Sequence, residues 1–322
     1  MKSVLYAFFA LFVSFTVSAD YSAHPSADAF VTKMVQEHGF SEADIRGALS
    51  NAKKKNSILK AISRPAEKRL TWEKYSKIFL TKNRVVNGRQ FMEKYKDTLA
   101  RAEEKYGVPK EIITAIIGVE TRYGGNMGSY RVIDALATLG FDYEPRSKFF
   151  TKELEEMFLL AREQGFDPLK LEGSYAGAMG YGQFISSSYR HYAVDFDGDD
   201  VADILNNPID AIGSVANYFK AHHWKTGRPV AAPVQFGEFD YQPFLQKKLK
   251  PKHRMADLRA EGFDQFEAIS GDEPTRVLVL QGANGEEQWL AWHNFYVITR
   301  YNHSHLYAMA VYQLSKEFSA EK

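Results

Sequence analysis

The chain has 322 residues, of which 45% are hydrophobic and 14% aromatic, enough to bury a sizeable core in two or three subdomains. Its 41 basic and 40 acidic side chains leave a formal net charge of +1, so nothing in the charge points to nucleic acid, and a neutral polymer fits better. The absence of cysteine excludes disulfides, thiolate metal sites and cysteine nucleophiles, and it argues against a lipid-modified N-terminal cysteine.

The chain opens with MKSVLYAFFALFVSFTVSA. Lys2 precedes an apolar run that closes on the small residues Val17-Ser18-Ala19, a pattern typical of a secretory signal peptide. The alternative is an uncleaved membrane anchor, but the run is short for a full span. We therefore expect residues 1–19 to be a signal peptide and the mature protein to be soluble in the periplasm, without a lipid anchor.

Residues 20–100 are rich in helix formers and charged side chains, which predicts a helical N-terminal subdomain. Ser41 followed by Asp44 is typical of a helix start. In the segment TWEKYSKIFL, Trp72 and Tyr75 recur at helical spacing. This spacing favours core packing over a surface that stacks on a ligand.

The segment 101–225 remains helical and carries an acid in an apolar helix, AIIGVETRYGG. Pro109 suits the first turn of this helix and Gly124 suits its stop. Residues three, four and seven apart share one face, so Glu120 lies on an isoleucine stripe formed by Ile113, Ile116 and Ile117. Burial raises the pKa of a carboxyl group toward a value useful for donating a proton, so Glu120 is a candidate general acid. A structural acid paired with a base such as Arg122 fits the helix equally well.

A glycine-dense stretch, GSYAGAMGYGQFISSSY at 173–189, interrupts the helical pattern. Gly177, Gly180 and Gly182 would let the backbone come close to a ligand or to a neighbouring segment. The stretch lacks the Gly-Lys-Ser/Thr ending of a phosphate loop, which excludes that interpretation.

The segment DFDGDDVADILNNPID predicts a cation site. Three aspartates alternate, as the first three oxygen ligands of an EF-hand loop do, and the seventh position would supply a main-chain carbonyl. Position twelve of the loop is Asn206, where an EF-hand has Glu. An aspartate at the start of the next helix is therefore the candidate for the last ligand of the cation. Many protein oxygens in one flexible loop favour a structural Ca²⁺ over Mg²⁺, and an ordinary solvated loop is the alternative. The candidate ligands are Asp195, Asp197, Asp199, Val201 and Asp210.

Residues 226–292 predict a small β-rich subdomain, in which TRVLVLQGANGEEQWLAWH is typical of a β-hairpin turning at Asn284-Gly285. The lysine-rich stretch 247–254 indicates a solvated surface, with contact to an anionic polymer as the alternative. Residues 293–322 return to helical spacing and are expected to pack back on the core. The predicted fold class is α+β, mostly α.

Seven blocks resemble the lytic murein transglycosylase B family, in the order of that family. They are YGVPKEIITAIIGVETRYG, VIDALATLGFDYEPRSKFF, ELEEMFLLARE, GSYAGAMGYGQF, YAVDFDGD, DAIGSVANYF and NFYVITRYNHSHLYAMAVYQL. The similarity runs from RPAEKRLTW to residue 314. It implies a lysozyme-like helical core at 101–225, flanked by the helical and β-rich subdomains, with peptidoglycan glycan strands as substrate and one calcium site. We also expect the enzyme to be a monomer.

The resemblance also implies roles for single residues. Glu120 stands where the family keeps its only catalytic acid/base. Six residues stand where the family lines its glycan groove: Arg146, Ser174, Gln183, Tyr218, Tyr301 and Asn302. Tyr181 offers a further ring face for sugars, although Tyr181-Gly182 departs from a proline that is usual in the family. The five candidate ligands of the aspartate loop match the cation loop of the family.

The implied reaction needs a single acid, and no second acid accompanies Glu120 in an equally apolar block, whereas ordinary glycosidases pair two carboxylates. Glu120 would protonate the oxygen between N-acetylmuramic acid and N-acetylglucosamine and then accept the proton of the muramoyl 6-hydroxyl, which closes a 1,6-anhydro ring. The alternatives are a hydrolytic muramidase, which admits water, and a non-catalytic peptidoglycan-binding scaffold.

Overall fold

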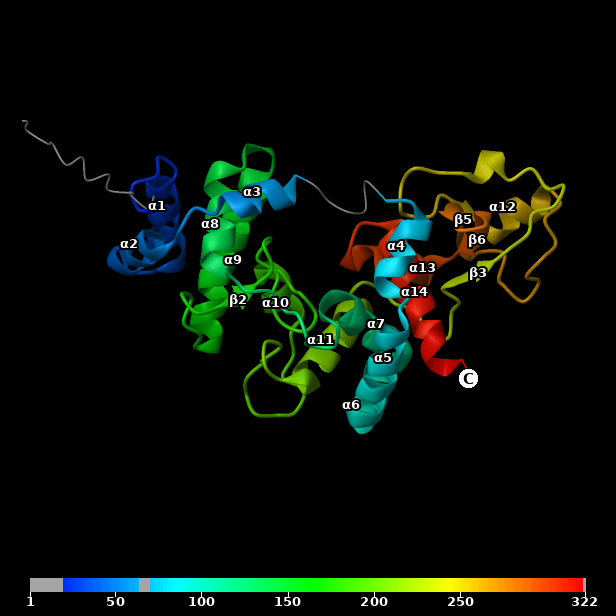
Figure 1. Ribbon diagram of the computed structural model, residues 1–322, viewed down its shortest axis with the longest axis horizontal. Coiled ribbons are helices and arrows are strands. Elements are labelled where there is room, and N and C mark those ends of the chain that lie inside the picture. The colour runs from blue at the N-terminus through cyan, green and yellow to red at the C-terminus, as the bar shows by residue number, and fades with distance from the viewer. Residues whose placement is uncertain (1–19, 64–69, 321–322) are drawn as a thin grey trace, which may run out of the picture.

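The computed structural model describes residues 20–63 and 70–320 (Figure 1). The signal peptide predicted at 1–19 lies outside these residues. Helices dominate the described ranges, and the strands form one two-stranded and one four-stranded antiparallel sheet. The predicted class, α+β and mostly α, is confirmed. In the described ranges no helix combines the length and the apolarity that crossing a membrane requires.

One hydrophobic core joins the first helices of the chain to its middle, on the left of Figure 1. Its short sheet pairs β1 (Tyr130–Arg131) with β2 (Glu172–Gly173). The helices of this core are α1 (Ala27–His38), α2 (Glu42–Asn51), α3 (Asn56–Ile62), α8 (Val132–Asp142), α9 (Ser147–Gln164) and α10 (Ser186–Tyr192). The 3-10 turn η2 (Glu144–Arg146) connects two helices that pack on each other, α8 and α9.

A second core surrounds the helix that carries Glu120. The predicted helical subdomain at 20–100 is divided between the two cores, because residues 20–62 pack in the first and residues 72–99 in the second. The domain boundaries therefore remain a prediction. The helices of the second core are α4 (Trp72–Phe79), α5 (Lys82–Lys94), α6 (Lys96–Tyr106), α7 (Lys110–Thr121), α11 (Pro208–Ala221), α13 (His293–Tyr301) and α14 (His305–Ser319).

The β-rich unit has the strand order β3-β6-β5-β4 and a small core of its own. Gly282 pairs with Gly285, so the hairpin turns at Ala283 and Asn284, one residue earlier than predicted. Gly285 opens the returning strand with a φ of 113°, which only glycine adopts readily. The lysines of the stretch 247–254 are exposed, as expected of a solvated surface. The elements are β3 (Ala231–Pro233), η3 (Gln242–Phe244), β4 (His253–Arg254), α12 (Met255–Ala260), β5 (Pro274–Gly282) and β6 (Gly285–Ala291).

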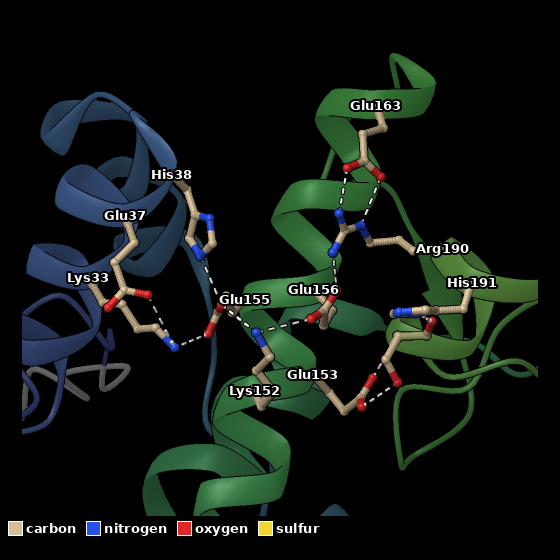
Figure 2. Close-up of polar contacts among 11 residues, drawn as sticks. Lys33, Glu37, His38, Lys152, Glu153, Glu155, Glu156, Glu163, Arg190 and His191 are labelled. Carbon is tan, nitrogen blue, oxygen red and sulfur yellow. Dashed lines mark hydrogen bonds and ion pairs between the residues drawn. The ribbon is translucent and has the colours of Figure 1, made fainter.

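A chain of ion pairs crosses the first core from α1 to α9 and on to α10 (Figure 2). Glu155 on α9 is 3% exposed and lies 2.6 Å from Lys33 Nζ and 2.8 Å from His38 Nε2, both on α1. On α10, Arg190 pairs with Glu163 at 2.6 Å. Burial would raise the pKa of Glu155, but hydrogen bonds from its basic neighbours prevail and lower it to about 2.

Candidate active site

The helix α7 carries Glu120 in its last turn. Ile113, Ile116 and Ile117 are completely buried, and Glu120 is half-buried at the end of the same stripe. The helix ends at Thr121, earlier than the glycine stop predicted, because Arg122 and Tyr123 take left-handed backbone angles with φ of 54° and 62°. The Thr121 hydroxyl accepts a hydrogen bond from the Gly124 N–H at 3.0 Å, which closes the turn.

A buried arginine lies beneath this end of α7. Arg84 of α5 is 7% exposed, and its guanidinium donates to the carbonyl oxygens of Gly118 and Val119. The last carbonyls of a helix carry partial negative charge, so a cation there stabilises the helix end. Burial lowers the pKa of Arg84. The Tyr123 hydroxyl donates to the Arg84 carbonyl oxygen at 2.7 Å, which ties the turn after α7 to α5.

Two tyrosines from the C-terminal helices lie near Glu120, the buried Tyr307 and the partly buried Tyr301. The hydroxyl of Tyr307, on α14, donates to Glu120 Oε1. Burial raises the pKa of Tyr307 and of Tyr301 well above the usual value, and the negative charge of Glu120 adds to both shifts. Both hydroxyls therefore remain protonated and act as donors. Tyr75, correctly predicted to be buried, contributes to the shift of Tyr307 and so lies near the same cluster.

The sequence reasoning missed Tyr307. The segment SHLYAMAVYQL showed only helical spacing, which predicts burial and says nothing about what a hydroxyl contacts. Tyr307 is 2% exposed. A phenol in an otherwise aliphatic helical stripe needs a polar partner when buried, and this was the available signal.

The glycine-dense segment packs against the end of α7 as a tight loop. Its Met179 and Phe184 form an isolated antiparallel bridge. The carbonyl oxygen of Tyr181 lies 2.9 Å from the Thr121 hydroxyl, and the carbonyl oxygen of Gly182 accepts from the Tyr301 hydroxyl at 2.6 Å. A Cβ at Gly182 would lie 2.8 Å from that hydroxyl oxygen, so the close approach requires glycine.

Two polar side chains brace this loop. Gln183 has a φ of 50°, and its Nε2 donates at 3.0 Å to the carbonyl oxygens of Met127 and Gly180. Ser174 Oγ accepts from the backbone N–H of Ala178 at 3.1 Å. Both side chains are half-buried, so each keeps one surface toward solvent.

The remaining candidate residues differ in their surroundings. Tyr218 is 7% exposed, donates to the Arg300 carbonyl oxygen at 2.7 Å and meets the Tyr301 ring edge-on at 4.8 Å, so most of its ring is packed. Asn302 ends α13 and is half-buried. Arg146 is exposed in η2, with its guanidinium 4.2 Å from the centre of the Phe149 ring.

Tyr181 and Tyr301 pack against both large hydrophobic cores. The site around Glu120 therefore lies where the two cores meet. α7, the glycine-dense loop and the turn between α13 and α14 converge there, although they are far apart in the sequence.

The aspartate loop brings four carboxylates together. Oxygen atoms of Asp195, Asp197, Asp199 and Asp210 all lie within 4.8 Å of one another. Asp210 is buried, and burial together with the charges of Asp197 and Asp195 raises its pKa. The carbonyl oxygen of Val201 accepts from the Asp203 N–H at 3.1 Å. Four converging carboxylates repel one another unless a cation lies between them, and an all-oxygen donor set suits Ca²⁺.

Comparisons with known proteins agree with this arrangement. The family model described as transglycosylase SLT domain matches residues 22–316. The chain is 44% identical over 309 residues to membrane-bound lytic murein transglycosylase B of Escherichia coli (strain K12), covering 93% of this chain and 84% of that protein. The structure of catenated lytic transglycosylase SltB1 of Pseudomonas aeruginosa is 50% identical with a TM-score of 0.89, covering 93% of this chain and 99% of that chain. Escherichia coli Slt35, solved in complexes with bulgecin A and with calcium, is 45% identical with a TM-score of 0.85, covering 94% and 95%.

These matches confirm the resemblance inferred from the seven blocks, the lysozyme-like fold and the lyase class of the enzyme. They favour the lytic transglycosylase over the muramidase and the scaffold, because the relatives are lytic transglycosylases along nearly the whole chain. The chain belongs to the transglycosylase SLT domain family, whose lytic murein transglycosylases cleave peptidoglycan with formation of anhydromuropeptides.

Proposed function

We propose that Glu120 acts alone as general acid and then general base in this reaction. The protonated carboxyl group gives its proton to the oxygen between N-acetylmuramic acid and N-acetylglucosamine as the bond from that oxygen to the muramoyl C1 breaks. The acetamido group of the muramoyl residue supports the positive charge at C1. The Glu120 carboxylate then takes the proton of the 6-hydroxyl, whose oxygen bonds to C1 and closes the 1,6-anhydro ring.

The observation that carries this proposal is the Tyr307 contact. A hydroxyl that is fixed by burial and donates to Glu120 Oε1 sets the orientation of the carboxyl group and stabilises its charged form. The apolar stripe behind Glu120 limits water, which would otherwise compete with the 6-hydroxyl.

The candidate groove residues have supporting roles in this proposal. Ser174, Gln183 and Asn302 would hydrogen-bond acetamido and hydroxyl groups, while Tyr181 and Tyr301 would offer ring faces to sugars. The other two candidates are Tyr218, most of whose ring is packed, and Arg146, which lies in η2. Tyr218 would act mainly by holding the Tyr301 ring, and Arg146 would contact the strand from η2.

A Glu120→Gln variant tests the proposal. It keeps the size of the side chain and can still accept from Tyr307, so the fold and the binding of purified cell walls should persist. Release of anhydromuropeptides, followed by mass analysis, should fall by at least about 1,000-fold because the only proton donor is lost. Glu111→Gln, in the first turn of α7, is the matched control and should keep full activity. Anhydromuropeptide release by Glu120→Gln at the normal rate would remove Glu120 from the mechanism.

We also propose that the aspartate loop holds a structural Ca²⁺, with carboxylates from Asp195, Asp197, Asp199 and Asp210 and the Val201 carbonyl as ligands. The convergence of the four carboxylates and the calcium complex of Slt35 support this assignment. The further proposal is that the enzyme is exported by its first nineteen residues and works in the periplasm as a soluble monomer on glycan strands. The signal-like pattern and the peptidoglycan substrate support it.

A further inference from the structure

A polar cavity of about 380 Å³ lies beside the end of α7, between this helix and α5. Its walls come from the end of α4, from α5 and from the turn that follows α7, and its lining includes neither Glu120 nor a residue of α14. Two arginines and two asparagines contribute to the walls: Arg84, Arg122, Asn83 and Asn87.

Two positive charges and no carboxylate line the cavity. Burial lowers the pKa of Arg84, and the adjacent charge of Arg122 lowers it further. Within residues 20–63 and 70–320, no ion pair involves either arginine. Arg84 already bonds the carbonyls of α7, whereas Arg122 is exposed. Two like charges that line one cavity favour an anion inside it.

The backbone directs Arg122 to this place. Arg122 and Tyr123 are consecutive non-glycine residues in the left-handed region, a conformation that is unfavourable for a residue with a Cβ. The surroundings hold them there, because the Tyr123 hydroxyl bonds the Arg84 carbonyl and its ring packs so closely on Gly118 that a Cβ would lie 2.6 Å from the hydroxyl oxygen. Strain kept by packing at the end of a catalytic helix points to a function for Arg122.

We propose that this cavity binds a carboxylate of the peptide stem carried by the glycan strand, with Arg122 as the principal contact. The inference rests on the proposed function and adds a peptide subsite to it. A planar guanidinium pairs with a carboxylate through two parallel hydrogen bonds, and the amides of Asn83 and Asn87 suit the peptide groups of a stem. Arg122 follows Glu120 by two residues, and three to four extended stem residues reach roughly 10–14 Å.

The test compares two substrates for the full chain: glycan strands with intact peptide stems, and strands whose stems have been removed with an amidase. The Arg122→Gln variant should raise KM about tenfold on stem-bearing strands, because one charge-assisted contact is lost, and should leave kcat unchanged. On stem-free strands both constants should match those of the wild-type protein. Arg122→Lys keeps the charge without the planar fork and should give an intermediate KM.

Lys82→Gln is the matched control, because it removes one exposed positive charge from α5 without lining the cavity. Its KM should equal that of the wild-type protein on both substrates, which separates a local contact from net charge. An unchanged KM for Arg122→Gln on stem-bearing strands, or an equal rise on both substrates, would overturn the peptide subsite. Failure of the proposed function would look different, since Glu120→Gln would then release anhydro product from both substrates at the wild-type rate.

Discussion

The partner of Glu120 lies 187 residues further along the chain, at Tyr307. The isoleucine stripe of α7 was enough to predict on which face the carboxyl group lies, because helical spacing fixes that face. It could not predict the partner, since the hydrophobic pattern of a distant helix records only that the helix is buried. The family blocks supplied candidate residues for the site, but the Tyr307 contact came only from the fold.

Tyr307→Phe keeps the buried ring and removes the hydroxyl, so the fold should persist while the Glu120 carboxyl group loses its fixed donor. A hydrogen bond to a charged group is worth about 1.5–3 kcal/mol, which predicts a loss of about 10–100-fold in kcat with little change in KM. Steady-state release of anhydromuropeptides measures both constants.

Tyr312→Phe is the control for that experiment. Tyr312 is on the same helix, and its hydroxyl donates to the Ala231 carbonyl oxygen, away from Glu120. Its loss should leave kcat unchanged. Equal kcat values for the two variants would mean that Tyr307 does not position Glu120.

At the scale of elements, periodicity predicts the helices but not the core that each one joins. Residues 20–100 read as one helical stretch, yet α3 packs on α8 and α4 packs on α14. An apolar stripe predicts that one face of a helix is buried, but it does not predict which element packs against that face. The hairpin shows the same limit at finer scale, because Asn284-Gly285 predicted the turn while the cross-strand pairing moved it by one residue.

Ion pairs help to attach α1 to α9, and Glu155 is the acid that these pairs share (Figure 2). The folded pKa of Glu155, about 2, lies below the usual 4.5, so its charged form stabilises the fold above pH 4.5 and this contribution disappears as the pH falls toward 2. The shift corresponds to about 3 kcal/mol, but Lys33 and Lys152 are 38% and 51% exposed, so screening reduces the figure to about 1–2 kcal/mol.

Glu155→Gln should therefore lower the free energy of unfolding by about 1–2 kcal/mol at pH 7 and by progressively less as the pH falls from 4.5 toward 2. Denaturant unfolding at several pH values measures this difference. Glu37→Gln, which removes an exposed partner of Lys33 at 3.9 Å, is the control and should change stability by less than about 0.5 kcal/mol. A deficit for Glu155→Gln that is the same at pH 7 and pH 3 would contradict the assigned charge effect.

At the scale of the whole molecule, two hydrophobic cores share one site, and the aspartate loop is a second link between them. Phe196, within the loop, belongs to the core around α7, where its ring lies 6.0 Å from that of Tyr106. Ile204, further along the same loop, belongs to the core of α8 and α9. The spacing of the aspartates in the sequence predicted the candidate ligands, but nothing in the sequence showed that the loop joins two cores.

A cation bound in this loop should therefore stabilise the assembly of both cores, because the unfolded chain does not bring Asp195 close to Asp210. At a Ca²⁺ concentration about 100 times Kd, linkage adds about 2.7 kcal/mol, which for a chain of this size raises Tm by roughly 4 °C. Calorimetry with Ca²⁺ and with a chelator measures the shift. Mg²⁺ should give a smaller one, since it keeps its own waters and demands tighter geometry.

Asp199→Asn removes one ligand charge at the exposed rim of the loop and should reduce the Ca²⁺-dependent rise in Tm, whereas Asp240→Asn, at an exposed turn of the β-rich unit, should leave it intact. If both cores respond to the cation, chelation should lower hydrogen-exchange protection in α9 and in α7 together. Loss of protection confined to residues 195–210 would show that the loop is stabilised locally, and an unchanged Tm with chelator would show that it binds no cation.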